Sequence, residues 1–407
     1  MAQVALFPLG AGHVLAHPGA CRTIAGELTR RGHDATLVYG GLERPLVDDG
    51  IPIEPTVEVE RGRLGPNSVG RAFHGRALDG LVEADLAVLD RVRPDAAIVD
   101  CRLSAAIACE AAGIPFVSVV HFFRSTPWSA PEPLARALGR RDRIRRIARI
   151  VRWSLDRDPL GLATLARTIA DTRARFGLDP ARPMFEGDRV ACTTTPRLDP
   201  ASRLPPHWRY VGPVTWSAPS DAEPPRRGER PLVYVTQGST GSAATLARTV
   251  RELARDPVDV LVTTAALCEP GELEALAPNV RAERLLPGRA CMEAADVAVV
   301  HGGHLTTIEA HLTGTPVVVV PHGYDQFVWA NRAERLGTGV AVRPPSLPGA
   351  IRRGVRRVLR SDRYRRAAAP IAEDLRRWDG PANVADLLEE LAGDTATTPA
   401  VTARGSG

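Results

Sequence analysis

The sequence predicts an α/β fold that is built twice, as two domains with parallel sheets and crossover helices. Short apolar runs rich in β-branched residues alternate with helical patterns along the 407-residue chain, which is typical of βαβ units. The length suits two domains, because one domain takes roughly 100–200 residues. Residues 216–231 contain four prolines and mixed charge, which predicts an extended linker between the two halves.

Residues 1–215 form the first predicted domain. A helix is predicted over Pro18–Arg31, because its apolar residues share one face and Gly32 follows it, where a helix-ending glycine belongs. Four apolar runs predict strands, at Val4–Pro8, Ala35–Tyr39, Ala96–Asp100 and Phe116–Val120.

An arginine-rich segment lies in the same domain. Residues 136–157 carry nine arginines above a row of apolar residues at helical spacing. We interpret the segment as the solvated basic face of an amphipathic helix. Contact with an acceptor or attachment to a membrane surface are the alternatives.

Residues 232–363 form the second predicted domain. Its predicted strands are Leu232–Thr236, Val258–Thr263, Val280–Arg284, Val297–Val300 and Val317–Val320, with a helix over Leu347–Leu359. Residues 392–407 have almost nothing to bury, so this tail is predicted to be disordered.

Composition excludes several classes of protein. The 52 basic residues are all arginines and are interleaved with 47 acidic ones, so the net charge of +5 implies no nucleic-acid partner. Six cysteines without a C-x-x-C pair argue against a zinc site and a disulfide framework, and we expect them to be small buried apolar residues. The sequence has no uninterrupted run of about 18 apolar residues, so no membrane span is predicted. The first residues lack the pattern of a signal peptide, so we expect a cytoplasmic protein.

The residues with the clearest chemistry follow the predicted strand Val297–Val300. The His-Gly-Gly turn at 301–303 ends this strand and opens a helix, which places unpaired backbone N–H groups and the positive end of a helix dipole at the sheet edge. Such a turn suits a phosphate group. The carboxylate of Glu309 suits the two hydroxyls of a ribose, and the Asp-Gln pair at 325–326 suits sugar hydroxyls.

Residues 301–342 resemble the donor-binding region of the family-1 glycosyltransferases, which include bacterial natural-product enzymes. That family has the GT-B fold, two Rossmann-like domains facing across a cleft. Its motif runs H-G-G-x-G-T-T-x-E-A, then G-x-P, P-x-x-x-D-Q, N-x-x-R and G-x-G. In register or nearly so, this chain supplies His301, Gly302, Gly303, Thr306, Thr307, Glu309, Ala310, Gly314, Pro316, Pro321, Asp325, Gln326, Asn331, Arg335 and Gly337-Thr338-Gly339. Agreement over about forty residues is far more specific than any single turn.

The resemblance implies that the second domain binds a nucleotide-sugar. The implied donor-binding residues are Gly238, Ser239, Thr240, Leu285, Leu286, His301, Gly302, Gly303, Thr306, Thr307, Glu309, Asp325 and Gln326. The implied contacts are the diphosphate for His301, Thr306 and Thr307, the ribose for Glu309, and the transferred sugar for Asp325 and Gln326.

The chain departs from the family pattern at two positions. Leu305 stands where the family often has Gly or Asn, and its Cβ changes the room for a phosphate. Leu285 stands where many relatives place an aromatic residue against the nucleobase. Weaker stacking follows there, which leaves the choice between uracil and thymine open.

The resemblance also implies a catalytic base in the first domain. In the family a Gly-His follows the first strand, and an Asp at the end of a later strand binds that His. Here His13 follows Gly12, and Asp100 ends a predicted strand. An imidazole at a helix N-terminus stays neutral, and a carboxylate on its other nitrogen fixes the tautomer. Gly12 and the spacing from the strand favour His13 as the base. Counting back from the helix end favours His17, which is the alternative.

The resemblance therefore implies an inverting, metal-independent transfer of a sugar from a dTDP- or UDP-sugar to a small-molecule aglycone. A polyketide-like or aromatic aglycone is expected. We expect no cofactor beyond the nucleotide-sugar co-substrate, no nucleic acid and a monomer or homodimer, with residues 364–391 returning to the first domain as the family's last helix does.

Other classes of function fit less well. A nucleotide-sugar 2-epimerase or hydrolase of the same fold, or a non-catalytic nucleotide-sugar-binding partner, would need no His–Asp base. Nicotinamide binding is disfavoured because the glycine turn at 10–12 lacks its third glycine and the second strand lacks a terminal acidic residue. A metal pair of His13 and His17 is disfavoured because Pro18 predicts that the helix starts after them.

Overall fold

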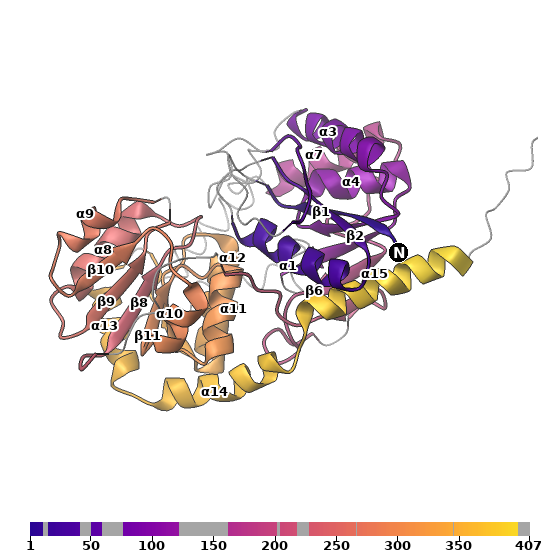
Figure 1. Ribbon diagram of the computed structural model, residues 1–407. Helices are drawn as coiled ribbons and strands as arrows, with labels where there is room; N and C mark the ends of the chain where they lie inside the picture. Colours follow the sequence, from indigo (N-terminus) through magenta and orange to yellow (C-terminus); the bar gives the residue numbers. More distant parts are fainter. Residues whose placement is uncertain are drawn as a thin grey trace, which may run out of the picture.

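A computed structural model describes residues 1–10, 15–40, 50–58, 76–121, 162–201, 204–217, 228–265, 267–344 and 346–397. Two α/β domains lie side by side, the first in indigo to magenta and the second in salmon to orange (Figure 1). His13, the arginine-rich segment 136–157 and residues 218–227 of the predicted linker lie outside the described residues.

The first domain contains a parallel sheet with the strand order β3-β2-β1-β4-β5-β6-β7. Continuous apolar runs form its centre because both faces are covered by helices. Its strands are β1 (Gln3–Pro8), β2 (Asp34–Val38), β3 (Ile53–Glu54), β4 (Ala96–Asp100), β5 (Phe116–Val120), β6 (Arg189–Cys192) and β7 (Trp208–Tyr210). The four strands predicted for this half are present, and β3, β6 and β7 are additional.

Helices α3 (Ala77–Val92), α4 (Leu103–Ala112) and α7 (Leu162–Arg175) cover one face of this sheet, and α1 (Ala16–Arg30) lies on the other (Figure 1). Helix α1 begins two residues before the predicted start. Pro18 is its third residue, where the missing N–H has no partner to lose, because the first four N–H groups of a helix are free. The prediction that the helix starts after His17 was therefore wrong.

The second domain contains a parallel sheet with the order β10-β9-β8-β11-β12-β13. Its strands are β8 (Leu232–Thr236), β9 (Asp259–Thr263), β10 (Val280–Glu283), β11 (Val297–Val300), β12 (Val317–Val319) and β13 (Gly339–Ala341). The helices are α8 (Ala243–Leu253), α9 (Pro270–Glu274), α10 (Gly288–Ala294), α11 (His304–Thr313), α12 (Tyr324–Leu336) and α13 (Ala350–Leu359). Apolar residues of α8 and α13 pack on one face, and those of α10, α11 and α12 on the other.

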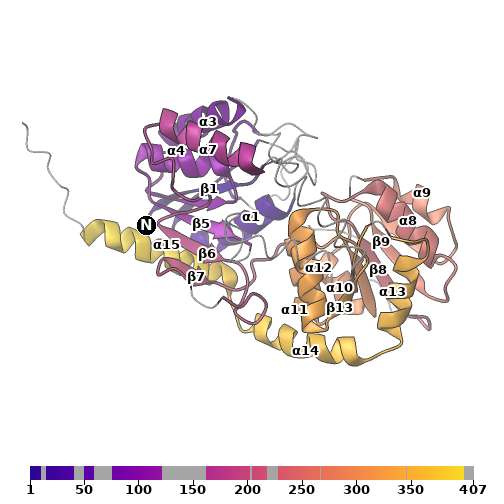
Figure 2. The same cartoon turned by 180° about the vertical axis from the view of Figure 1, so that it is seen from behind.

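The last two helices join the domains. Helix α14 (Arg363–Arg376) contacts α11, and α15 (Gly380–Thr397) runs along the first domain in both views (Figures 1 and 2). Apolar residues of α15 share a core with α1 and with β1, β2, β4 and β5. They are Val384, Ala385, Leu387, Leu388 and Leu391.

Helix α15 also corrects the predicted tail. The chain is helical to Thr397, six residues into the segment 392–407 that was predicted to be disordered. Once a helix is nucleated, each further residue that is fixed gains one hydrogen bond, and the first proline in this segment is Pro399. Residues 398–407 lie outside the described part of the chain. No helix of the described residues is long and apolar enough to cross a membrane.

The packing of α15 predicts a large loss of stability on truncating its apolar face. Leu388 is 1% exposed, so Leu388→Ala should lower the free energy of unfolding by about 2–5 kcal/mol, measured by urea denaturation. Glu390→Ala is the matched control, because its ion pair with Arg209 is solvent-exposed and should contribute less than about 1 kcal/mol. Equal effects of the two substitutions would contradict the packing.

Candidate functional site

The strand order fixes where each domain can bind a ligand. In the first sheet β1 pairs with both β2 and β4, and in the second β8 pairs with both β9 and β11. Successive strands are added on one side of β1 or β8 and then on the other, so the strand order reverses there. Ligands of open parallel sheets bind at such points, beyond the carboxyl ends of the strands. Asp100 ends β4 in register with Pro8, and His301 follows Val300, which pairs with Thr236.

A histidine and an aspartate meet at the first of these edges. Asp100 is completely buried, and Nδ1 of His17 donates a hydrogen bond to its Oδ2 at 2.9 Å. Burial would raise the pKa of Asp100, but the charge and hydrogen bond of His17 outweigh it and lower the pKa. An ionised Asp100 holds the proton of His17 on Nδ1, which leaves Nε2 able to accept a proton.

The structure brings together His17 and Asp100, two of the three predicted catalytic residues. His13 lies outside the described residues, so the expected preference for His13 over His17 stays a prediction. Because α1 begins at Ala16, His17 lies in its first turn, at the positive end of the helix dipole.

Two further histidines extend this pair toward the second domain. His121 follows β5 directly, and its ring stacks on His17 with centroids 4.6 Å apart. On its other side it stacks on His304, the first residue of α11, at 4.2 Å and with the ring planes 8° apart. The three imidazoles therefore form one column from the first domain into the second.

The rings of His121 and His304 are uncharged at neutral pH. Burial lowers the pKa of His121 to about 4. Burial is also the main cause that lowers the pKa of His304. His304 is also hydrogen-bonded at 3.1 Å to Thr193 of the first domain. Neutral stacked rings at neutral pH avoid the repulsion that imidazolium pairs would suffer, so the two domains can meet here.

Sequence reasoning missed both histidines. His121 comes one residue after the predicted strand Phe116–Val120, at the same sheet edge as Asp100, and this position was the available signal. His304 occupies the variable position of the H-G-G-x motif, which gives no signal of its own. His121, His17, Asp100 and Cys101 place their metal-ligating atoms within 4.8 Å of one another.

The second edge is built around His301. A Cβ on Gly238 or on Gly303 would lie 2.7 or 2.4 Å from the imidazole of His301, so these positions require glycine. His301 is 3% exposed, and burial lowers its pKa to about 4. Its Nε2 lies 3.5 Å from the hydroxyl of Thr240, and its Nδ1 has no hydrogen-bond partner in the described parts of the chain.

Helix α11 starts immediately after this histidine. Gly303 is its N-cap and supplies no side-chain acceptor, so the first N–H groups are available to an anion. Thr306 is half-buried, whereas Thr307 is fully buried and donates its hydroxyl hydrogen to the carbonyl of Gly303 at 2.8 Å. Thr307 therefore stabilises the first turn of the helix in this state.

Glu309 lies deeper on the same helix. It is 7% exposed, and its carboxylate accepts a hydrogen bond from the hydroxyl of Ser217 at 3.1 Å. Burial raises its pKa to about 7. Its Oε2 lies beside Gly288, the first residue of α10. Of the predicted base contacts, Leu285 is 37% exposed and Leu286 is buried.

The Asp-Gln pair lies at the start of α12. The side-chain oxygen of Gln326 accepts hydrogen bonds from the backbone N–H groups of His322 and Gly323, at 2.7 and 3.1 Å. Its amide NH₂ group is thus what remains for a ligand. Asp325 keeps more than a third of its surface exposed, yet the surrounding protein raises its pKa, and His17 of the other domain acts in the opposite direction.

Comparisons with known proteins agree with this geometry. Residues 244–391 match the family described as erythromycin biosynthesis protein CIII-like, C-terminal domain. A PGL/p-HBAD biosynthesis rhamnosyltransferase of Mycobacterium bovis is 32% identical over 321 residues, covering 76% of this chain and 70% of that protein. The 4'-demethylrebeccamycin synthase of Lentzea aerocolonigenes is 30% identical over 407 residues, covering 90% of this chain and 95% of that protein. The chain belongs to the family-1 glycosyltransferases.

A solved structure shows that this glycosyltransferase has the GT-B fold. The spinosyn rhamnosyltransferase SpnG complexed with thymidine diphosphate superimposes with a TM-score of 0.70 at 16% identity, covering 95% of this chain and 100% of that chain. The predicted fold class, two Rossmann-like domains, is confirmed.

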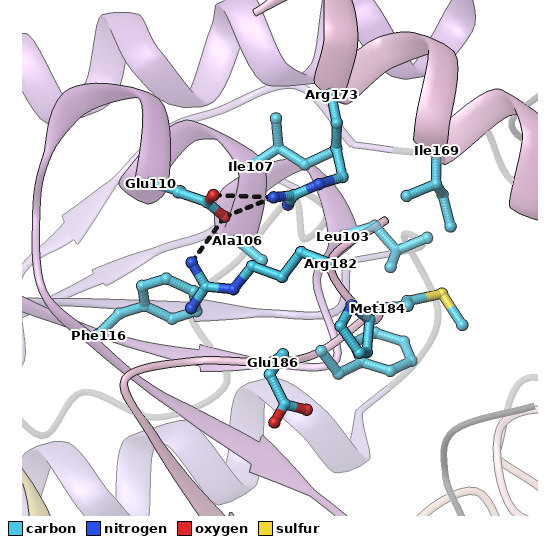
Figure 3. Close-up of a pocket in the computed structure, with 12 residues that line it drawn as sticks. Leu103, Ala106, Ile107, Glu110, Phe116, Ile169, Arg173, Arg182, Met184 and Glu186 are labelled. Carbon is cyan, nitrogen blue, oxygen red and sulfur yellow. Dashed lines mark hydrogen bonds and ion pairs between the residues drawn. The ribbon is translucent and has the colours of Figure 1, made fainter. Parts of the chain in front are cut away.

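A small cavity elsewhere in the glycosyltransferase is not a substrate site. It lies between α4 and α7, where Glu110 binds Arg173 and Arg182 at 2.8 and 3.0 Å (Figure 3). Its volume of about 10 Å³ holds roughly one water molecule.

The glycine contacts at His301 give a stability prediction. Gly303→Ala should lower the free energy of unfolding by about 1–3 kcal/mol, because the added methyl group overlaps the imidazole. Gly26→Ala is the control: Gly26 is exposed inside α1 with no atom within 4 Å of an added Cβ, so the change should stabilise by about 0.5–1 kcal/mol. Chemical denaturation measures the free energy of unfolding of both variants. An unchanged value for Gly303→Ala would refute the overlap.

Proposed function

We propose that this glycosyltransferase moves a sugar from a dTDP- or UDP-sugar to a small-molecule natural product, with inversion and without a metal ion. One observation carries the proposal: a His–Asp pair in one domain lies two stacked imidazoles away from the free N-terminus of α11 in the other. A base and an anion site that face each other across a domain boundary suit the transfer of a group between two bound molecules.

The base acts on the acceptor. Nε2 of His17 takes the proton of an acceptor hydroxyl as its oxygen attacks the anomeric carbon of the sugar, and Asp100 stabilises the imidazolium that forms. The bond from that carbon to the diphosphate oxygen breaks on the opposite face, so the configuration inverts. The N–H groups that open α11 stabilise the charge that develops on the diphosphate, which is the task a metal ion performs elsewhere.

Donor recognition follows from the second domain. Glu309 binds the ribose hydroxyls once Ser217 yields its hydrogen bond, and Asp325 with the NH₂ group of Gln326 binds the sugar. Thymidine diphosphate bound to SpnG favours a dTDP-sugar. The half-exposed Leu285 offers the nucleobase an apolar contact without aromatic stacking.

The names of the relatives favour a natural-product acceptor. They include a PGL/p-HBAD biosynthesis rhamnosyltransferase and a 4'-demethylrebeccamycin synthase. A polyketide-like or aromatic aglycone remains our expectation for the acceptor, as does the cytoplasm for the location of the protein.

His17→Ala should lower kcat/KM for transfer by about 10²–10⁴-fold, because the general base is lost. The assay combines dTDP- and UDP-sugars with a panel of aglycones and identifies products by mass. His33→Ala is the control, since His33 lies beyond the far end of α1 and pairs with Glu389. His13→Ala is measured alongside, and a larger loss there would assign the base to His13.

The same assay separates the alternative functions. Nucleotide released at the same rate with and without aglycone would indicate a hydrolase, and a changed sugar on an intact donor would indicate an epimerase. Binding of nucleotide-sugar without turnover would indicate a non-catalytic partner. Each of these results would reject transfer.

The buried Glu309 predicts a pH dependence of stability. Its pKa is about 7 in the folded protein and ordinarily near 4.5, so the folded state binds more protons between these values. Stability contributed by this group is therefore lost as the pH rises from about 4.5 to 7, by up to about 3 kcal/mol. Glu309→Gln should gain stability over the wild type between pH 5 and 8. The free energy of unfolding of both proteins is measured by urea denaturation across this pH range. Equal pH dependence of the wild type and Glu309→Gln would contradict the prediction.

A further inference from the structure

We propose that His17, Asp100, Cys101 and His121 form a binding site for a thiophilic divalent cation, best suited to Zn²⁺, and that its occupation inhibits transfer reversibly. The inhibition rests on the proposed function, because it concerns the base His17. The binding of the ion does not, since it depends only on the four side chains.

The ligand set suits zinc. Two imidazoles, one carboxylate and one thiol are the groups that bind Zn²⁺ in proteins, and here their ligand atoms lie within 4.8 Å of one another. With metal–ligand bonds of roughly 2.0–2.3 Å, neighbouring ligand atoms of a tetrahedral site lie about 3.3–3.6 Å apart. Oδ2 of Asp100 lies 2.9 Å from Nδ1 of His17, and Oδ1 lies 3.6 Å from Nε2 of His121. The two rings are stacked with their planes 14° apart, so they must turn out of the stack for both nitrogen lone pairs to point at one ion.

One buried oxygen at this site accepts no hydrogen bond within the described part of the chain. Asp100 is completely buried, and its Oδ1 accepts no hydrogen bond from the described residues. This oxygen faces Nε2 of His121 at 3.6 Å, beyond hydrogen-bonding distance. A cation between this oxygen and the imidazole of His121 would interact favourably with both.

Cys101 follows Asp100 directly, and its Sγ is one of the four neighbouring ligand atoms. Cys101 has a φ of +55°, a left-handed conformation that residues with a side chain rarely adopt. Its Sγ lies 3.6 Å from the carbonyl of Val119, two residues before His121. Cys101 is also only half-buried, which corrects the expectation that all six cysteines are buried; Cys268 is the other exception.

Binding of the ion would disable the base. A metal–nitrogen bond to Nδ1 of His17 displaces its proton, and the tautomer that remains carries hydrogen on Nε2 and can no longer accept one there. The thiol of Cys101 loses its proton to solvent as the metal–sulfur bond forms. The side chain of His121 is 21% exposed, which gives the ion a route from solvent.

The test of binding is a titration of the full chain with Co²⁺, a spectroscopic substitute for Zn²⁺. We expect the intense visible bands of a tetrahedral site, a sulfur-to-cobalt charge-transfer band, and loss of both when Zn²⁺ is added. Cys101→Ser should remove the charge-transfer band and weaken binding by about tenfold or more. Cys268→Ser, at the other half-exposed cysteine, should leave the spectrum unchanged.

Thermal melting keeps the test valid if a variant is poorly folded. Zn²⁺ should raise the melting temperature of the wild type and not that of Cys101→Ser. Absence of tetrahedral bands in the wild type, or an unchanged charge-transfer band in Cys101→Ser, would overturn the site.

The test of inhibition compares transfer rates with and without Zn²⁺, each relative to the metal-free rate of the same protein. Zn²⁺ should slow the wild type and Cys268→Ser by about tenfold or more, and Cys101→Ser much less. Mg²⁺, which prefers oxygen ligands, should slow none of them. Cobalt bands without inhibition would overturn the inhibitory role. Bands in a protein that catalyses no transfer would support the site and reject the proposed function.

Discussion

A carboxylate with no exposed surface needs a partner of opposite charge or a set of hydrogen-bond donors, and Asp100 meets this need through His17. Much of the site follows from that pairing. It places the N-terminus of α1 over the carboxyl end of β4 and fixes the tautomer of the imidazole. His121 stacks on the ring of His17, and His304 of the second domain stacks on His121.

The relation between the domains depends on further polar contacts around this column. Arg332 of α12 pairs with Asp199 at 2.5 Å, and the hydroxyl of Thr195 donates to Asp374 of α14 at 2.8 Å. The ring of Trp329 lies 5.4 Å from that of His304 and beneath the guanidinium of Arg332. The Trp329 contacts lie within the second domain and position His304 and Arg332. The contacts of Asp199 and Thr195 reach out of the first domain between buried or half-buried groups, and they help to fix how the two domains lie.

The sequence predicted the central strands well, because continuous apolar runs bounded by turns have few alternatives: β4, β5, β8 and β11 have the predicted bounds. Short edge strands such as β3 and β13 contain too few apolar residues to be predicted from the sequence pattern. The edges that hold Asp100 and His301 were predictable from strand ends alone. The hydrogen bonds of Thr307 to Gly303 and of Gln326 to the start of α12 could not be predicted, because they depend on local geometry.

Helix α15 makes the first domain discontinuous along the chain. A fragment that stops at the linker would expose the apolar surface that Leu387 and Leu388 cover on α1 and the sheet. Chimeras that exchange C-terminal halves between relatives would therefore also exchange one wall of the partner domain. A second crossover after α14, added to the one at the linker, returns the native α15 to each first domain, whereas a single crossover at the linker mixes two sets of packing that did not evolve together.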